Sequence, residues 1–562
     1  METETRRKEN KYYLFDSGIA KHAEGTQLKQ GEVEKILTNA GWIDQYNWTP
    51  ESGLPDWEHK VSIMYPNVEY DEAGGKYKIW YHALQNDSPV DEYRWTENII
   101  DRENSKSVDL GDFKNTARGL VHEGHDVLCY MESEDGINWH RPELGEFFYK
   151  TRSGEIIGTN IAYIGTHGLG VQRNENPDPN EPRYLMSGRA WETDSFDRKG
   201  EPIGVAVSWS EDGYHWEDQI TIKTAYDCAP DIFYVRADTH NQLFWSEELR
   251  KYVVITRGYT KATPHVRTVA YMESTDELSS IRDLLAAKRK GGEKYWEKTA
   301  KFWTCPETVL DHNVSLDAQP YSMPQAHVAD GCYVGVVSVA NFDKEGRGVW
   351  NSVHAELAWS PDAKNWNYID KGNPFIKNAE KFALEAGNDY GMIYSAAPVN
   401  VGNRTDIFYS ATAELHYIAY DEIPDDIKKI VDEKIPKAAE KRAVTRTSTL
   451  KIARIPKDRY AAIWAESGTV TTNTFSVSGE KLVVTADVCE GGCVKIEVSG
   501  SDGMVIDGYS ADDFDVITEN ITEKNVSWGG KDLSALCGRE VSFRILLENA
   551  GVYTIGGEIK RI

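Results

Sequence analysis

Short apolar segments alternate with polar turns along the first four-fifths of the chain. The pattern is clearest in Val207–Trp216, where an apolar run leads into Ser-Glu-Asp-Gly-Tyr-His-Trp. Ser210 and Asp212 are residue types that bond their own backbone in turns, and Gly213 supplies a positive φ. Trp216 then supplies an apolar side chain that covers the next strand. We therefore predict a β-strand followed by a tight turn here.

The turn sequence Ser-x-Asp-Gly-x-x-Trp recurs along the chain. One further copy starts at Ser133, and a looser copy has Ala363 in the glycine position. The sequence of residues 269–276 is similar to that of residues 129–135, but the Gly and the Trp of the turn do not follow it. An apolar strand at Leu450–Arg454 stands where another copy is due, without the turn. These comparable spacings suit a four-stranded sheet repeated radially, and five repeats predict a five-bladed β-propeller.

Each predicted blade opens with an apolar strand that follows polar residues. The openings are residues 56–70, 159–164, 236–245, 320–324 and 388–394. The innermost strand of each propeller blade runs along a central channel. We therefore expect polar residues at these openings to meet in one pocket, although they are far apart in sequence.

The pattern changes outside the repeats. Residues 1–50 are predicted to be a lead-in with a short helix from Gln30 to Asn39. Residues 278–290 and the highly charged stretch 423–444 are helical in pattern, and we take the second as a connector. After about residue 465, short alternating strands with Gly and Asp turns are typical of an antiparallel β-sandwich. The predicted fold is therefore all-β, with a five-bladed β-propeller at 51–465 and a β-sandwich at 466–562.

Composition narrows the classes of partner. A chain of 562 residues, 40% of them hydrophobic, is large enough for two domains. The net charge of −27 argues against binding to nucleic acid or to an anionic membrane. Without an apolar signal segment or a run of about 18 apolar residues, we expect a cytoplasmic protein. A homo-oligomer stays open as a possibility.

The seven cysteines are scattered and match neither a disulfide scaffold nor a set of metal ligands. Cys489 and Cys493 flank Glu-Gly-Gly in a predicted hairpin, where two free thiols are expected in a cytoplasmic protein. The sequence calls for no metal and no cofactor.

The turns, the blade openings and the C-terminal phrases Gly503–Tyr509 and Val526–Gly530 carry a family resemblance. Over roughly residues 50–562 the chain resembles bacterial proteins related to glycoside hydrolase family 32, in the five-bladed propeller group with families 43 and 68. The resemblance implies a furanose-active or related glycosidase with its site at the propeller mouth. The family 32 motifs Trp-Met-Asn-Asp-Pro-Asn-Gly, Arg-Asp-Pro and Glu-Cys are not intact at the matching places.

Glycoside hydrolysis needs two carboxyl groups, one protonated as the acid and one acting as nucleophile or base. Acids at blade openings are therefore the catalytic candidates. Asp238 ranks first, because Arg236 and the polar residues after it can hold an ionised carboxylate. Glu58 is second, since the face of Trp57 could raise its pKa toward that of a general acid. Asp389 is third.

Other polar and aromatic residues, at the openings or on strands that could reach the channel, are candidates for holding the sugar. They are Trp57, Arg189, Arg236, His240, Asn241, Tyr321, His327, Glu385 and His416. For each, and for each candidate acid, the alternative is a structural role in the core, at the rim or in a turn. The aspartates of the repeated turns are expected to be structural.

The predicted function is hydrolysis or transfer of a glycosyl unit from a furanoside-containing oligosaccharide, such as a fructoside or arabinoside. One alternative is a carbohydrate-binding propeller without catalysis. Another is a sialidase-like exo-glycosidase, because the turn is similar to the sialidase Asp-box and sialidases pair a tyrosine nucleophile with an arginine cluster. A sialidase would need six blades, whereas the sequence predicts five. The net negative charge also does not favour an anionic sugar, so this alternative ranks lower.

Overall fold

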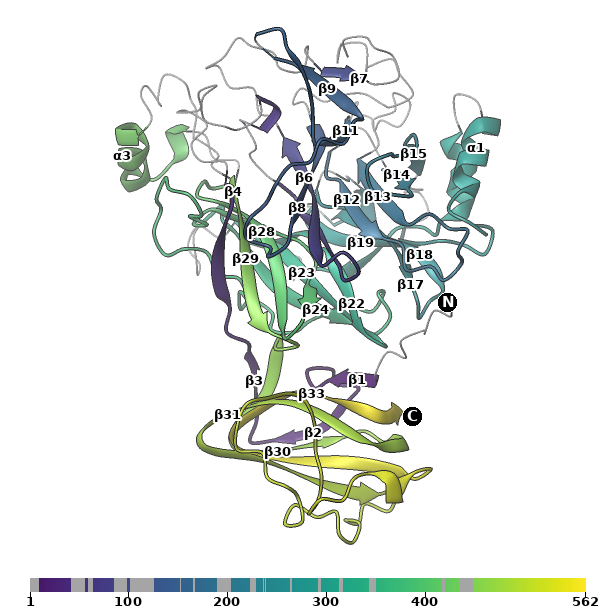
Figure 1. Ribbon diagram of the computed structural model, residues 1–562, viewed down its shortest axis with the longest axis vertical. Helices are drawn as coiled ribbons and strands as arrows, with labels where there is room; N and C mark the ends of the chain where they lie inside the picture. Colours follow the sequence, from purple (N-terminus) through teal and green to yellow (C-terminus); the bar gives the residue numbers. More distant parts are fainter. Residues whose placement is uncertain are drawn as a thin grey trace.

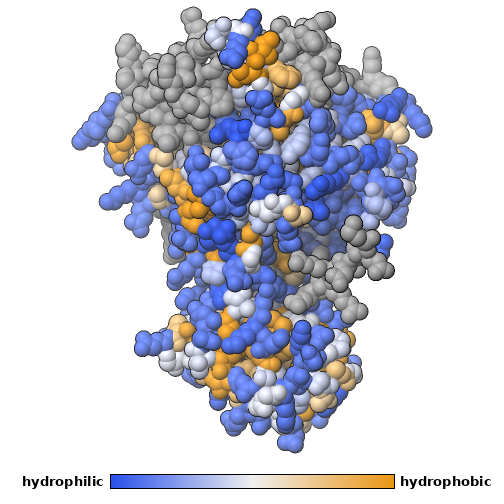
Figure 2. Space-filling model, in the orientation of Figure 1, coloured by the Kyte–Doolittle hydropathy of each residue, from blue (hydrophilic) through white to orange (hydrophobic). Residues whose placement is uncertain are grey.

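The chain forms two β domains, a larger propeller and a smaller sandwich, which lie one above the other in Figure 1. The face in Figure 2 is mostly hydrophilic, with hydrophobic residues gathered on the part of the sandwich nearest the propeller. The computed structural model describes residues 10–41, 56–58, 64–84, 99–101, 126–151, 153–164, 167–189, 204–222, 229–235, 237, 239–262, 265–291, 295–312, 317–342, 350–416, 420–434 and 448–562.

Five sheets make the blades of the propeller, as the sequence predicts. The first is ordered β11-β8-β6-β5 and the second β12-β13-β14-β15. Their strands are β5 (Asn67–Asp71), β6 (Lys76–Leu84), β8 (Asp126–Ser133), β11 (Ile161–Ile164), β12 (Gly170–Arg173), β13 (Tyr184–Arg189), β14 (Val205–Ser210) and β15 (Ile220–Ile222).

In the third and fourth blades the inner strand is split into two short strands that pair with one long strand. The third blade contains β16 (Ile232–Val235), β17 (Gln242–Ser246), β18 (Lys251–Thr260), β19 (Arg267–Glu273) and β20 (Glu307–Leu310). The fourth contains β21 (Ala318–Ser322), β22 (Gln325–Ala329), β23 (Cys332–Asn341), β24 (Val353–Ser360) and β25 (Asn367–Tyr368).

The fifth blade takes its outermost strand from the N-terminal segment. Its strands are β26 (Met392–Ser395), β27 (Val399–Val401), β28 (Arg404–Thr412), β29 (Ser448–Pro456) and β4 (Glu34–Gly41). A parallel pairing of Val353 with Met392 joins the fourth and fifth sheets. A small separate sheet contains β7 (Ile99–Asp101), β9 (Phe147–Lys150) and β10 (Ile156–Gly158).

Helices are short and lie outside the sheets. Among the described residues the α-helices are α1 (Asp283–Gly291), α2 (Trp296–Thr299) and α3 (Asp425–Lys434), and the 3-10 turns are η2 (Asp56–Glu58), η7 (Ala300–Phe302), η8 (Tyr420–Glu422) and η9 (Ser534–Leu536). α1 and α3 fall where the sequence predicts helices. None of the helices in the described ranges has the length and apolar character that a membrane crossing requires.

The repeated turn has the bonding that its sequence predicts. Backbone N–H groups of Ile137 and Asn138 donate to Asp135 Oδ1 at 2.8 and 2.7 Å, and the Gly136 N–H donates to Ser133 Oγ at 2.9 Å. Desolvation opposes ionisation of Asp135, but these donors lower its pKa to about 2. The aspartate therefore serves the turn, as expected.

The third copy shows why glycine is usual in this turn. Gly136 and Gly213 have φ of 77° and 90°, and Ala363 adopts φ 65° in the same place. The Trp366 indole N–H donates to the Ala363 carbonyl at 2.7 Å and closes the turn as in the other copies. The bonds of the turn therefore outweigh the strain of an alanine in the left-handed region.

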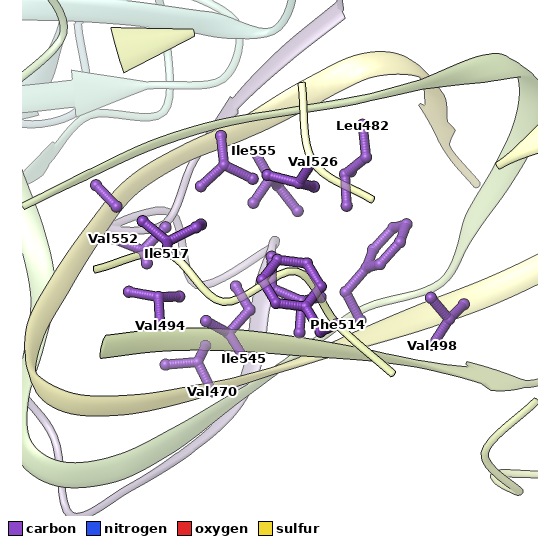
Figure 3. Packing of buried hydrophobic residues seen from close by; sticks show 14 of the residues in the cluster. Val470, Leu482, Val494, Val498, Phe514, Ile517, Val526, Ile545, Val552 and Ile555 are labelled. Atoms are coloured by element: carbon purple, nitrogen blue, oxygen red, sulfur yellow. The ribbon is translucent and has the colours of Figure 1, made fainter. Parts of the chain in front are cut away.

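The sandwich consists largely of two long bent strands, β31 (Phe475–Gly500) and β33 (Glu540–Arg561). Residues 482–488 face residues 550–557, and residues 493–500 face residues 541–548. The predicted strands are thus halves of these two. β30 (Ala461–Thr472) and β32 (Ile521–Asn525) flank them. Alternate residues such as Val494 and Val498 point into the apolar core of Figure 3.

Two expectations for the strands were wrong. Residues 34–41 are the strand β4 and not a helix, because Thr38 and Ala40 turn inward with the period of two that a sheet requires. Residues 161–164 do not open the second blade: β11 pairs with β8 and completes the first sheet.

The N-terminal segment is also more than a lead-in. β1 (Asn10–Tyr13) pairs with β33, whereas β2 (Ala20–Glu24) and β3 (Gln27–Gln30) pair with β30. These pairings could not be read from local pattern, because each partner lies more than four hundred positions away. Residues 10–41 therefore belong to the sheets of both domains.

The described cysteines are in two states. Cys489 and Cys493 are free thiols, as expected from their hairpin. Cys305 is in a disulfide. The sequence predicts free thiols only for the Cys489–Cys493 hairpin, and disulfides persist chiefly in oxidising compartments.

Candidate active site at the propeller mouth

The innermost strands of the five blades lie around one axis. β5 contacts both β12 and β27, and β12 contacts β17. These strands, together with β22, line a cavity of about 690 Å³. The five sheets are therefore arranged radially about a central channel.

Within the described blades, several buried polar side chains lie at one end of this channel. The second strand of each blade runs antiparallel to the inner strand, so it ends where the inner strand begins. His82, Arg189 and Asn341 lie near or at such ends, and Arg257 lies near the end of β18. All four are buried. We call this end the mouth.

The mouth faces away from the sandwich. At the start of β28, Arg404 pairs with Pro456 at the end of β29, and the chain then continues into β30 of the sandwich. The end of β28, and with it the mouth, is therefore at the far end of the blade, as the position of the sandwich in Figure 1 illustrates.

Tyr65 stands at the centre of the mouth. Its ring centroid lies 6.0 Å from that of His82, 6.1 Å from His167, 5.9 Å from His240 and 5.3 Å from Tyr394. These partners come from four different blades or blade openings. Tyr65 is fully buried and has φ 40°, a strained value for a side chain of this size. Strain of this kind is held only where the surroundings over-determine it, as at functional sites.

His240 is held as a neutral imidazole. Burial lowers its pKa to about 3. Its Nε2 lies 2.6 Å from Asn67 Oδ1, and the amide nitrogen of Asn67 donates to the carbonyl of Tyr65 at 3.0 Å and to that of Leu169 at 3.2 Å. Since Asn67 Oδ1 is thereby an acceptor, Nε2 carries the proton of His240.

Asn241 pins the start of the third blade. Its amide nitrogen donates to the carbonyls of Gly168 at 2.7 Å and Ala237 at 3.1 Å, and its oxygen accepts from the Thr256 hydroxyl at 2.6 Å. Asn241 is fully buried. These bonds give it a structural task within the blade.

Tyr321 joins the fourth blade to the third and the fifth. Its hydroxyl lies 3.0 Å from His416 Nε2. The Arg257 guanidinium carbon lies 3.8 Å from the Tyr321 ring centroid, and Arg257 donates to the Tyr321 carbonyl at 3.4 Å. Arg189 is buried at the end of β13 on the second blade. The structure thus brings His240, Tyr321 and His416 to the same end of the channel.

Glu58 lies in a buried ion pair on the first blade. Arg141 Nε donates to its carboxylate at 2.6 Å, and Asn160 donates at 3.1 Å. The Tyr81 hydroxyl donates to it as well, and burial raises the pKa of Tyr81 well above its usual range. Trp57 donates to Asn160 Oδ1 at 2.8 Å. This network fixes the turn η2 against β6, β8 and the segment before β11.

Asp389 is likewise committed to neighbouring strands. Lys35 and Lys451 lie 2.8 and 3.2 Å from its carboxylate, and the Tyr409 hydroxyl donates at 2.9 Å. Burial opposes its ionisation, but the two ammonium groups outweigh that effect and hold the pKa of Asp389 below its usual range. Asp389 therefore clamps β4, β28 and β29 together. Glu385 is exposed on the preceding turn.

The remaining predicted residues fall elsewhere. Asp238 and Arg236 lie outside the described residues. His327 lies at the opposite end of the channel, 2.9 Å from Glu248 and stacked on Tyr333. Burial raises the pKa of Glu248, but hydrogen bonds led by that from His327 lower it to about 2.

One group at that opposite end has the donors for a metal ion. Glu247, His327 and Asp330 offer ligand atoms within 4.8 Å of one another. Two of the three are exposed carboxylates, which commonly lie together without a metal. No role is assigned to this group.

Sequence reasoning missed His82 and Arg257. Each is a single ionisable residue inside an apolar strand, in Ile-Trp-Tyr-His-Ala-Leu and in Val-Val-Ile-Thr-Arg-Gly. A lone charge in a central strand is costly to bury without a purpose, and this is the signal that could have found them. The predicted catalytic acids lie at the openings of the inner strands, whereas these residues come from the second strands.

No protein-family model matches the chain, and no curated protein matches it. Solved structures with a similar arrangement include the β-1,2-mannobiose phosphorylase of Listeria innocua, at 9% identity and a TM-score of 0.39 over 75% of this chain and 97% of that one. A family 43 arabinoxylan arabinofuranohydrolase of Bacillus subtilis is 10% identical, with a TM-score of 0.36 over 90% and 96% of the two chains. A family 32 β-fructofuranosidase of Bombyx mori is 11% identical, with a TM-score of 0.35 over 89% and 92%. At these values the similarity says nothing of the activity.

Proposed function

We propose that the protein is a glycoside hydrolase or transglycosylase that acts on a furanoside-containing oligosaccharide, such as a fructoside or an arabinoside. The observation that carries the proposal is the meeting of His82, His167, His240, Tyr321 and His416 at one end of the channel. Aromatic faces and ring nitrogens in one place suit the stacking and hydroxyl contacts that a sugar needs.

Asp238 is the carboxylate to which we assign the nucleophile or base role. Thr239 and His240 follow it directly in sequence, and both are buried at the start of the third blade. Arg257, on strand β18 of the same blade, is buried at the mouth. We assign the second carboxyl role to Glu414, which is buried just beyond the end of β28.

Glu58 and Asp389 fit a positioning role better than a reacting one. Both are buried and held in ion pairs with cations of neighbouring segments. The same observation favours a second candidate, a carbohydrate-binding propeller without catalysis. The two candidates differ in whether any glycosidic bond is cleaved.

The test is turnover of aryl furanosides and short fructans by the wild-type protein and Asp238→Asn. We expect the substitution to lower kcat by at least a thousandfold while calorimetric sugar binding stays within a few-fold. Asp276→Asn, at an exposed acid beyond the other end of β19, is the control and should leave both unchanged. Sugar binding without cleavage by the wild-type protein would establish the second candidate instead.

A further inference from the structure

Two arginines lie on one face of the third blade at the mouth. Arg267, in β19, pairs directly across from Tyr259 in β18. Arg257 precedes Tyr259 by two residues and so points to the same face of the sheet. Diagonal cross-strand neighbours are within reach of long side chains. The blade therefore presents two guanidinium groups together.

Aromatic rings surround the Arg267 guanidinium. Its central carbon lies 5.4 Å from the ring centroids of Tyr321 and Phe342 and 5.9 Å from that of Tyr259. Tyr321 is the ring on which Arg257 also rests. Ring faces attract a cation but do not neutralise it, so these contacts leave the positive charge of Arg267 in place.

Arg267 donates a hydrogen bond from its guanidinium to an amide oxygen. Its Nη1 and its backbone N–H donate to Gln319 Oε1 at 3.0 and 3.2 Å, and its Nε is buried without an acceptor. Within the part of the chain that the structure describes, no carboxylate pairs with it. By contrast, Arg454 lies 2.7 Å from Asp406. The guanidinium N–H groups of Arg267 that do not bond Gln319 are therefore available to a ligand.

We propose that Arg267, with Arg257 beside it, is an oxyanion-binding subsite of the mouth. It rests on the proposed function, and it adds that the ligand carries a carboxylate, as in an acidic sugar, or is an inorganic phosphate that accepts a glycosyl unit. A planar guanidinium binds either group through two parallel hydrogen bonds. The net charge of −27 is spread over the whole molecule and does not set the sign of the electrostatic potential beside these two arginines.

The subsite is tested by calorimetry at low ionic strength with galacturonate, galactose and inorganic phosphate as probes. We expect the wild-type protein to bind one of the two anions at least tenfold more tightly than galactose. Preference for galacturonate indicates an acidic sugar, and preference for phosphate indicates a phosphorolytic acceptor. Competition between the two anions should show one shared site.

Arg267→Gln should weaken binding of the preferred anion at least tenfold, and Arg267→Lys should weaken it less. Arg173→Gln is the matched control, because this arginine lies on an inner strand at the other end of the channel, paired with Glu69. Thermal melts check that each variant is folded. Equal effects of Arg267→Gln and Arg173→Gln, or no anion binding by the wild-type protein, would overturn the subsite.

The failure of this inference is separable from that of the proposed function. If the wild-type protein cleaves neutral aryl furanosides but binds no anion, only the proposed subsite is contradicted. If the protein binds an anion through Arg267 but cleaves no glycoside, only the hydrolase assignment is contradicted.

Discussion

At the scale of single residues, buried polar side chains do two different tasks in this protein. At the mouth, His240 lies before β17 and Arg257 lies near the end of β18, and each contacts a ring from another blade or blade opening. Elsewhere Glu58, Asp389 and Glu356 pair with cations or histidines and hold strands together. The distinction comes from the partners of each group rather than from its burial, since all five are buried.

Gly213 should be intolerant of a side chain. A Cβ there would lie 2.6 Å from Trp80 Cζ2, and its φ is 90°. We expect Gly213→Ala to lower the free energy of unfolding by about 3 kcal/mol, from backbone strain and overpacking together. Gly75→Ala, with φ 64° and open space around the Cβ, should cost only about 1 kcal/mol. Urea unfolding measures both, and equal losses would contradict the packing argument.

Glu356 should make stability depend on acid pH. Burial opposes its ionisation, but His312 at 3.1 Å and His354 at 2.9 Å lower its pKa to about 2. Because the folded pKa lies below the unfolded one, the ionised group stabilises the fold above about pH 4.5 and this stabilisation is lost as pH falls toward 2. Glu356→Gln should therefore cost about 3 kcal/mol near pH 5 and much less near pH 2.

Unfolding at both pH values measures this difference for Glu356→Gln. Glu211→Gln, at an exposed residue paired with Arg282, is the control and should show no such pH dependence. If the loss in unfolding free energy is the same at both pH values, ionisation of the Glu356 carboxylate is not its cause.

At the scale of elements, the strand β4 closes the ring of blades. It pairs with β29 at the outer edge of the fifth sheet, where Thr38 donates to the Leu450 carbonyl at 2.8 Å. An unpaired edge of β29 would expose backbone donors and acceptors to other chains. The first and last parts of the propeller sequence are thus tied in one sheet, and β1 to β3 do the same for the sandwich.

Removal of residues 1–41 should prevent folding of both domains. It takes away β4 from the fifth blade and three strands from the sandwich sheet. We expect loss of soluble protein, or of a cooperative thermal transition followed by circular dichroism. Deletion of residues 1–9, which removes none of these strands, is the control and should retain the transition.

At the scale of the whole molecule, Asp458 joins the two domains. It is fully buried between β29 and β30, and it accepts from Lys11 Nζ and the Tyr13 hydroxyl, each at 2.6 Å. Burial lowers the pKa of Lys11, but Asp458 and Glu523 outweigh that effect and the pKa of Lys11 is raised. The N-terminal strand and the domain junction therefore share one buried ion pair.

Asp458→Asn tests this junction. Asn tolerates the positive φ of 66° at this position, so the substitution removes the charge and keeps the backbone. Leaving Lys11 without this partner should cost about 3 kcal/mol. The measurement is thermal unfolding, with Asp502→Asn on an exposed turn as control. A melting temperature equal to that of the control would show that the pair does not hold the domains together.

The sequence by itself determined the fold class, the five blades and the sandwich, because turn chemistry and the alternation of apolar residues are local properties. The bonds at Asp135 and the positive φ at Ala363 follow from the same local rules. Only the tertiary structure decided that residues 34–41 form the outer strand of the fifth blade, since their partner Ile452 lies hundreds of positions away.

The same holds for the candidate site. Sequence could place His240 and Tyr321 at blade openings and His416 on a segment that could reach the channel, and folding brings the three together. It could not show that Glu58 meets Arg141 or that Asp389 meets Lys35, because ion pairs between distant segments form only when the sheets close around the axis. Whether a buried acid reacts or supports is set by those partners, which only the closed propeller supplies.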